Sequence, residues 1–259
     1  MKVTILGSGS AYGVPYAGGG WGACDPNQPR NRRLSPSILV EDKGTRLLVD
    51  MSPDFRQQAE KHKIALIDGV FFTHAHADHI TGMFHLPIFM AHYQDRNLPM
   101  YADRFTRIGI EKLWWYMFDA RISPEYSGPG RPYWNEVIAP FPFKVGSLNV
   151  TPFMQEHGSI HSLGMRIGNF VYSTDVSGFP KESEKYLHDL DVWVVDCNCV
   201  TNTDKSHSNL EKSLGWIEKF KPKKAYLSHL DYTVDYDKIS ALLPKGVELA
   251  YDNLEFEVN

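Results

Sequence analysis

The chain has 259 residues, of which 42% are hydrophobic and 22% charged, and its formal net charge is −4 at pH 7. This length and apolar content are enough for one large core, so we expect a single domain over residues 1–259. The small negative charge argues against a broad basic face for a long nucleic acid, and the sequence has no apolar run of 18 residues that would predict a membrane span.

Three cysteines, Cys24, Cys197 and Cys199, make neither an even disulfide framework nor a Cys-x-x-Cys pair. The first six residues read as a strand and not as a signal peptide. The cysteine pattern is typical of a reducing compartment, and the strand-like start does not suggest secretion, so we expect a cytoplasmic protein. The sequence leaves the oligomeric state open, with a homodimer as one alternative.

In the first half of the chain, short apolar segments alternate with helical ones. The turn Gly7-Ser8-Gly9-Ser10 lacks the Lys-Ser/Thr ending of a phosphate-binding P-loop, so we interpret it as a tight turn that lets the backbone approach a site. The long loop after it carries Arg30, Arg32 and Arg33, which fit either a phosphate clamp or a solvated charged loop. We expect strands at 2–6, 37–41, 46–50, 67–72 and 100–102, and helices at 53–63, 78–92 and 103–118.

The second half is richer in strands and has fewer helices. We expect strands at 143–145, 148–154, 164–168, 170–173, 192–196, 225–228 and 247–251, and helices at 181–189, 209–220 and 235–243. Apolar strands at such regular intervals, interrupted by helices, predict an α/β fold in which two sheets pack face to face with helices outside.

Residues 105–138 are unusually aromatic, with Trp114 and Trp115 in a helical stretch and Tyr133 and Trp134 in a loop rich in Pro and Gly. A helix packed on the core explains them, because aromatic side chains bury much area. A lid over a site or a contact between subunits explains them as well, and the sequence alone does not separate these readings.

Four residues that commonly bind metals fall within six positions: His74, His76, Asp78 and His79. They follow an apolar run and precede a helical stretch, so we place them where a strand turns into a helix. His74 and His76 then point to the same side of extended chain, while Asp78 and His79 lie in the first helical turn. Imidazoles with a carboxylate suit zinc, manganese or iron better than calcium or magnesium.

Three further residues of this kind each come just after a later strand: His157, Asp175 and His229. Each is a weak signal alone, because a single His after a strand is more often a hydrogen-bonded loop residue. Together with the first four they make five His and two Asp, enough for two metal ions with Asp175 as a bridge.

With these ligands in this order, the chain resembles the metallo-β-lactamase superfamily. Within it, the chain is similar to the phosphoribosyl cyclic phosphate phosphodiesterases of phosphonate breakdown. The resemblance implies a four-layer αββα sandwich of two mixed sheets with the metal site at one edge. The closer similarity is carried by Gly7-Ser8-Gly9-Ser10, Gly13-Val14-Pro15, Ser173-Thr174-Asp175, Phe179-Pro180-Lys181, Val194-Val195-Asp196-Cys197, Ser206-His207-Ser208-Asn209-Leu210 and Ser228-His229.

The resemblance also implies how the ligands divide between two ions. It places His74, His76 and His157 on the first ion, Asp78, His79 and His229 on the second, Asp175 between them, and His207 beside the substrate phosphate. Two ions that share a water would lower its pKa, so that a metal-bound hydroxide attacks phosphorus. We expect Asp78 to orient this nucleophile and His207 to be the general acid or phosphate donor. The role of His161, four residues after His157, is left open.

These observations predict a dinuclear, metal-dependent phosphoric diester hydrolase. Its expected partner is a small, cyclic or acyclic, ribose or nucleotide phosphate, and its expected cofactors are two divalent ions, Mn or Zn, with Fe as a further alternative. Two other functions of the same fold are a nuclease similar to the tRNA-processing enzymes and a non-catalytic binding protein similar to the cofactor-biosynthesis relatives.

The chain departs from the phosphodiesterase relatives at a second, structural zinc site. Those relatives hold that zinc through a Cys-rich loop and a His three residues after the last ligand. This chain keeps only Cys24 in the loop, and Tyr232 stands at the later position. We therefore predict no structural zinc, and the identity of the substrate is open because this loop borders the mouth of the site.

Overall fold

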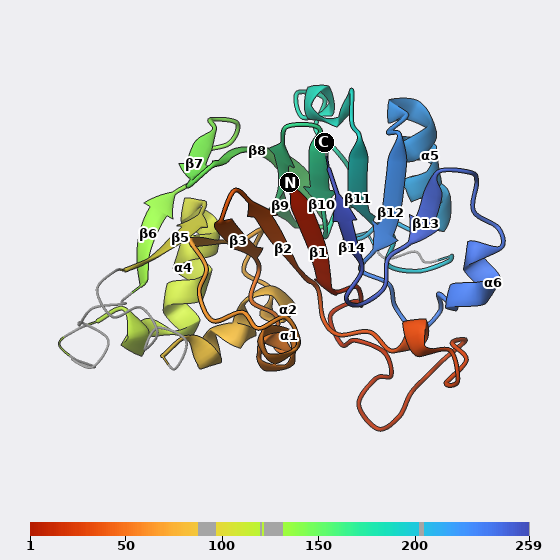
Figure 1. The fold of residues 1–259 in the computed structure, drawn as a ribbon, viewed down its shortest axis with the longest axis horizontal. Coiled ribbons are helices and arrows are strands. Elements are labelled where there is room, and N and C mark those ends of the chain that lie inside the picture. Colours follow the sequence, from red (N-terminus) through yellow and green to blue (C-terminus); the bar gives the residue numbers. More distant parts are fainter. Residues whose placement is uncertain (88–96, 120, 122–131, 202–204, 259) are drawn as a thin grey trace.

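A computed structural model describes residues 1–87, 97–119, 121, 132–201 and 205–258 (Figure 1). In these residues the strands form two sheets of seven, ordered β14-β1-β2-β3-β4-β5-β6 and β13-β12-β11-β10-β9-β8-β7. The predicted α/β sandwich of two mixed sheets is confirmed.

The first sheet lies mostly in the first half of the chain, and the second mostly in the second half. The strands of the first sheet are β14 (Glu255–Glu257), β1 (Lys2–Gly7), β2 (Ser37–Asp42), β3 (Thr45–Val49), β4 (Gly69–Phe71), β5 (Leu98–Ala102) and β6 (Pro132–Glu136). Those of the second are β13 (Val247–Leu249), β12 (Lys224–Ser228), β11 (Val192–Asp196), β10 (Phe170–Ser173), β9 (Ile160–Ile167), β8 (Leu148–His157) and β7 (Phe143–Val145).

The helices are short. The α-helices are α1 (Phe55–Lys61), α2 (Ala77–Ile80), α4 (Arg104–Leu113), α5 (Leu210–Phe220) and α6 (Tyr236–Ser240). The 3-10 turns are η1 (Pro29–Asn31), η2 (Thr81–His85), η3 (Trp115–Met117) and η5 (Glu184–Leu187).

Each sheet changes from antiparallel to parallel pairing along its width. In the first sheet β14, β1, β2 and β3 pair antiparallel, whereas β3, β4, β5 and β6 pair parallel. In the second, β7 to β10 pair antiparallel and β10 to β13 parallel. The carboxyl ends of parallel strands meet at one edge of a sheet, so the loops after β4, β10 and β12 share an edge of the sandwich.

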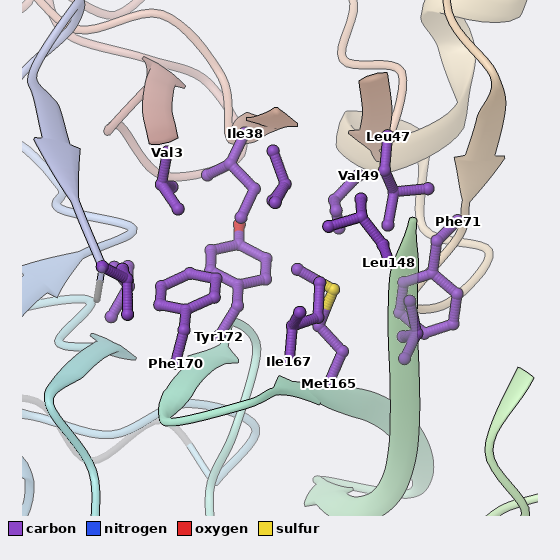
Figure 2. Packing of buried hydrophobic residues seen from close by; sticks show 14 of the residues in the cluster. Val3, Ile38, Leu47, Val49, Phe71, Leu148, Met165, Ile167, Phe170 and Tyr172 are labelled. Atoms are coloured by element: carbon purple, nitrogen blue, oxygen red, sulfur yellow. The ribbon is translucent and has the colours of Figure 1, made fainter. Parts of the chain in front are cut away.

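The core between the sheets follows from the alternation of side chains along each strand. In β2, Ile38 faces the other sheet while its neighbour Leu39 faces the outer helices. In β10, Phe170 and Tyr172 face inward and Val171 outward. Figure 2 shows side chains of the first sheet above those of the second in this layer. Each fully buried side chain of this size contributes about 1.5–3 kcal/mol.

Two strands were not expected from the sequence, and several helices are shorter than expected. The strand β6 occupies residues expected to be loop, and β14 pairs with β1 in a way that no local pattern reveals. The expected helix over 181–189 is only the 3-10 turn η5. The expected helix over 78–92 begins as the single turn α2 and continues as η2, and residues 88–92 of it lie outside the described part.

A close backbone approach gives a physical reason for the short α2. The amide of Gly82 donates to the carbonyl of Met51 at 2.9 Å, and a Cβ at Gly82 would lie 2.2 Å from the carbonyl of Ser52. This contact pins the chain to the loop after β3, so the segment tightens into 3-10 geometry instead of extending as an α-helix.

The aromatic segment packs on one side only. In α4 and the turn after it, Ile110 and Met117 are buried, whereas Phe105 and Trp115 are 53% and 54% exposed. The interpretation of this segment as a helix packed on the core therefore holds for one face of the helix. Residues 120 and 122–131 of the aromatic segment lie outside the described part. No helix in the described ranges is long and apolar enough to cross a membrane.

Candidate metal centre

The loop after β4 carries the first four candidate ligands to the edge of the sandwich. His74 and His79 are fully buried, Asp78 is 9% exposed, and His76 lies at the surface. The rings of His74 and His76 are 4.5 Å apart, so the two side chains do lie together as their spacing suggests. Asp78 and His79 lie in the single helical turn α2.

The second sheet brings the other three residues to the same place. His157 is the last residue of β8, and not a loop residue after a strand as the sequence suggested. Asp175 and His229 follow β10 and β12. The seven side chains form two groups of four that share Asp175, with the ligand atoms of each group within 4.8 Å of one another: His74, His76, His157 and Asp175; Asp78, His79, Asp175 and His229.

The two oxygens of Asp175 face different groups. Its Oδ1 lies 3.8 Å from Nε2 of His74 and 3.7 Å from Nε2 of His157. Its Oδ2 lies 3.0 Å from Nε2 of His79 and 3.4 Å from Nε2 of His229. One carboxylate with an oxygen directed at each of two histidine sets has the geometry of a bridge.

The ligand atoms of the two groups fit divalent ions in two respects, their spacing and the imidazole nitrogens that have no hydrogen bond. Bonds of about 2.0–2.2 Å place donors on a shared ion about 3–4 Å apart, which matches these separations. The Nε2 atoms of His74, His79 and His229 are buried and make no hydrogen bond within the described chain. Since buried polar atoms are nearly always paired, these three nitrogens fit the role of ligands to a cation. These residues could therefore hold two divalent ions.

The electrostatics agree with this reading. Burial, helped by the charge of His79, lowers the pKa of His74 well below its usual value. Burial acts to raise the pKa of Asp175, but His229, His79 and His74 outweigh it and hold that pKa well below its usual value. Neutral imidazole and ionised carboxylate are the forms that bind metals. The pKa of His79 is raised, against burial, by Asp78, Asp175 and Asp50, and an ion would replace that proton.

Asp50 is a site residue that the sequence reasoning missed. Its Oδ2 lies 2.7 Å from Nδ1 of His79, and its two oxygens accept from the amide and hydroxyl of Thr73 at 2.8 and 2.9 Å. This contact directs Nε2 of His79 toward Asp78 and Asp175. A signal was present, because Asp50 ends an apolar strand in the same way as Asp175 does.

Three of these residues leave their strands in a left-handed backbone conformation. The φ angles of Asp50, Asp175 and His229 are 62°, 51° and 62°. Such values are uncommon outside glycine, although Asp, Asn and His adopt them more readily than other residues. The sharp turn at each strand end aims the side chain into the site instead of along the sheet.

His207 lies beside the two groups and is held by a buried carboxylate. Its Nδ1 lies 3.0 Å from Oδ2 of Asp196, which also accepts from the amide of Val176. Its ring stacks on His229 at 4.9 Å and meets His157 edge-on at 4.9 Å. Asp196, His207 and His229 could also hold an ion, but Oδ2 of Asp196 already has two donors, so we interpret Asp196 as the residue that orients His207.

The glycine-rich turn supports the strand end that carries His229. The carbonyl of Ser8 accepts from the amide of Leu230, and the amide of Ser10 donates to the carbonyl of Leu230. A Cβ at Gly7 would lie 2.0 Å from the carbonyl of Ser35, so only glycine fits. The turn therefore packs against protein backbone, as the tight-turn interpretation expects.

Arg33 lies beside Cys24 in the long loop after the glycine-rich turn. Its buried guanidinium donates to the carbonyls of Asp231 and Val234 at 3.1 and 2.7 Å, and lies 3.8 Å from Sγ of Cys24. It ties the long loop to the segment after His229. Arg33 is thus not a phosphate clamp.

The two neighbouring arginines pack on aromatic rings. The Arg30 guanidinium lies 4.3 Å from the ring centre of Tyr251, and that of Arg32 lies 5.1 Å from the ring of Trp21. His161, whose role the sequence left open, lines a cavity beside His207, and its Nε2 lies 2.6 Å from Oδ2 of Asp103.

Comparison with known proteins agrees with this fold and site. The β-lactamase superfamily domain matches residues 45–230. A crystal structure described as a new diphosphatase from the PhnP family is 30% identical, covers 100% of this chain and 98% of its own, and superposes with a TM-score of 0.91. Zn²⁺-bound PqqB from Methylobacterium extorquens has the same fold, with 18% identity, full coverage of both chains and a TM-score of 0.76.

A curated relative is longer than this chain. The octanoyltransferase of Porphyromonas gingivalis is 31% identical over 259 residues, which cover 98% of this chain and 51% of that protein. The chain therefore spans about half the length of this relative. From the domain match and the full-length similarity to the diphosphatase, this chain belongs to the β-lactamase superfamily and, within it, to the PhnP family.

Proposed function

We propose that this protein is a dinuclear metal-dependent hydrolase that cleaves small phosphodiesters. The observation that supports it best is Asp175, whose two oxygens face separate histidine groups. When bound, two divalent ions would supply a water of lowered pKa and positive charge at the oxygens of the phosphate. Such a site performs hydrolysis without a strong protein base.

The residues of the chain would divide the remaining work. Asp78 lies at the rim of the site, with its Oδ2 3.0 Å from Nε2 of His79, and can accept a hydrogen bond from the attacking water and orient it. His207 has its Nδ1 held by Asp196, so its Nε2 lies on the opposite side of the ring and can give a proton to the leaving oxygen. The P–O bond to that oxygen breaks as the bond to the water oxygen forms, and the water proton passes by way of Asp78 to solvent.

A second candidate is hydrolysis of a diphosphate bond, which the diphosphatase of 30% identity favours. The chemistry at phosphorus is the same, and the two candidates differ in what leaves: an alcohol from a diester and a phosphate from a diphosphate. The similarity to the octanoyltransferase covers about half of that protein, so it does not lead us to propose acyl transfer.

The test is metal analysis coupled to a substrate screen. The purified protein is loaded with Mn²⁺, Zn²⁺ or Fe²⁺ and assayed on bis(p-nitrophenyl) phosphate, 2′,3′-cyclic nucleotides, nucleoside diphosphates and an acyl thioester. We expect two ions per chain and turnover of a phosphate ester or diphosphate. Activity confined to the thioester, or no activity in a chain that holds both ions, would overturn the proposal.

The variant Asp175→Ala links the metal content to the activity. Because each oxygen of Asp175 faces one group, we expect the variant to lose both ions and all turnover. A variant that keeps two ions would show that Asp175 is not the bridge.

A further inference from the structure

A cavity of 630 Å³ opens against His207. Its wall comes from the adjoining ends of β8 and β9, the segment after β10, and the residues that lead into and begin α5. The volume lies in the range of pockets for small molecules. Because His207 is part of the wall, a group in this cavity would touch the side chain that we propose as proton donor.

Basic side chains outnumber acidic ones in this wall. Lys205, Lys212, His161 and His207 are the basic residues among the described lining, and Glu156 is the acidic one. The His161 ring is paired with Asp103, whose hydrogen bond raises the pKa of the imidazole. The charges of the two lysines are thus balanced in part by Glu156, and one anionic group in the cavity would neutralise the remainder.

Lys212 stands where a helix usually avoids a positive charge. It is the third residue of α5, and its amide donates to the capping side chain of Asn209. The N-terminal end of a helix carries partial positive charge, so a lysine there is unfavourable and an acidic residue is preferred. The ammonium of Lys212 donates to the carbonyl of Ser177, which holds it at the cavity. A residue that is locally unfavourable and lies at a cavity beside the site is a candidate for a binding role, and the exposed ammonium of Lys212 is available to an anion there.

We propose that this cavity binds the leaving portion of the substrate, and that this portion carries a negative charge recognised by Lys212 and Lys205. The assignment rests on the proposed function, because His207 marks the leaving side only if it protonates the leaving oxygen. The substrate class is then a phosphate ester whose alcohol bears a carboxylate or a phosphate, or a diphosphate in which phosphate itself leaves. Fixed positive charge would hold that anion before and after the P–O bond breaks.

A matched pair of substrates tests the charge of the leaving portion. Methyl 4-carboxyphenyl phosphate and methyl 4-carbamoylphenyl phosphate share the scissile phosphate and differ in the charge of the phenol that leaves. For the metal-loaded wild type we expect kcat/KM to be about tenfold higher for the carboxyphenyl ester. In Lys212→Gln and in Lys205→Gln we expect this preference to shrink toward one, with the metal content unchanged.

Lys219→Gln is the control, because Lys219 lies on the same helix and pairs with Glu184 outside the cavity lining. It should keep the tenfold preference. If wild type hydrolyses both esters equally, or if Lys212→Gln lowers both rates alike, the anionic leaving portion is wrong while the phosphodiesterase function stands. If metal-loaded wild type hydrolyses neither these esters nor any phosphate substrate of the screen, the proposed function itself has failed.

Discussion

The Oδ2 atom of Asp50 lies 2.7 Å from Nδ1 of His79, and both side chains are fully buried. Asp50 contributes no atom to either candidate ligand group in the described residues, yet it fixes the ring of a histidine that belongs to one. Carboxylates in this position hold a ligand ring in the orientation that a metal needs.

We therefore expect Asp50→Asn to weaken binding of the ion held by His79. Loss of such a contact typically costs roughly 10–100-fold in metal affinity or activity. Competition with a chromophoric chelator measures the affinity of both ions. The affinity for the ion held by His74 should change less. Equal affinities in variant and wild type would show that Asp50 does not support metal binding.

His207→Ala separates proton donation from metal binding. We expect the metal content to be unchanged and turnover to fall roughly 10²–10⁴-fold, because the leaving oxygen loses its proton donor. In Asp196→Asn, turnover should fall less, because the His207 ring stays in place but is oriented by a weaker acceptor. The effect of His207→Ala should be smallest for a substrate with a p-nitrophenolate leaving group, which needs no proton. A uniform loss across substrates, or a loss of metal, would mean that His207 acts otherwise.

Arg33→Met should destabilise the fold without touching the site chemistry. The buried guanidinium donates to the carbonyls of Asp231 and Val234, and the variant would lose both of these hydrogen bonds. We expect the free energy of unfolding to drop by about 2–4 kcal/mol, since hydrogen bonds to charged groups are worth about 1.5–3 kcal/mol each. Urea unfolding measures it. The exposed Arg32 gives the matched control, Arg32→Met, which should change stability by about 0.5 kcal/mol or less.

Asp252 should make stability depend on pH. Burial raises its pKa to about 6, against the hydrogen bonds from Leu34 and Ser8. An acid whose pKa is higher in the folded than in the unfolded chain binds more protons when folded, so its contribution is complete below pH 4 and is lost as the pH rises through 6. The shift from 3.8 to about 6 corresponds to about 3 kcal/mol.

Comparison with Asp252→Asn isolates this contribution, because the other titrating groups are common to both proteins. The difference in free energy of unfolding, wild type minus variant, should fall by about 2.4 kcal/mol between pH 4 and pH 7. A difference that is constant over this range, or that rises, would show that Asp252 is ionised throughout.

The sequence predicted the sandwich, and it predicted that seven residues form one metal site, because both predictions depend on local patterns. Apolar alternation marks strands such as β2 and β10, and polar residues at strand ends converge wherever strands are parallel. The two strands it missed depend on distant partners. The strand β14 exists because it pairs with Lys2–Thr4 at the other end of the chain, and β6 begins at a proline that a central strand would exclude.

The roles of the supporting residues could not be predicted for a similar reason. Asp50 and Asp196 each end an apolar strand, but what they do depends on the neighbour that each one meets in the folded protein. The cavity beside His207 is assembled from three separate segments, so no stretch of sequence contains it. The sequence left Arg33 open as part of a phosphate clamp or of a solvated charged loop. It is instead a buried cross-link, because the loop around it folds back on Asp231 and Val234.

The left-handed turns at Asp50, Asp175 and His229 restrict which amino acids evolution can place there. A β-branched or bulky residue would be strained in this conformation whether or not a metal binds, while Asn and Gly would be tolerated. A family member that has abandoned catalysis is therefore expected to carry Asn or Gly at these positions, and one that carries Val or Leu has changed its backbone as well. Genome surveys can use this difference to tell a silenced enzyme from a remodelled fold.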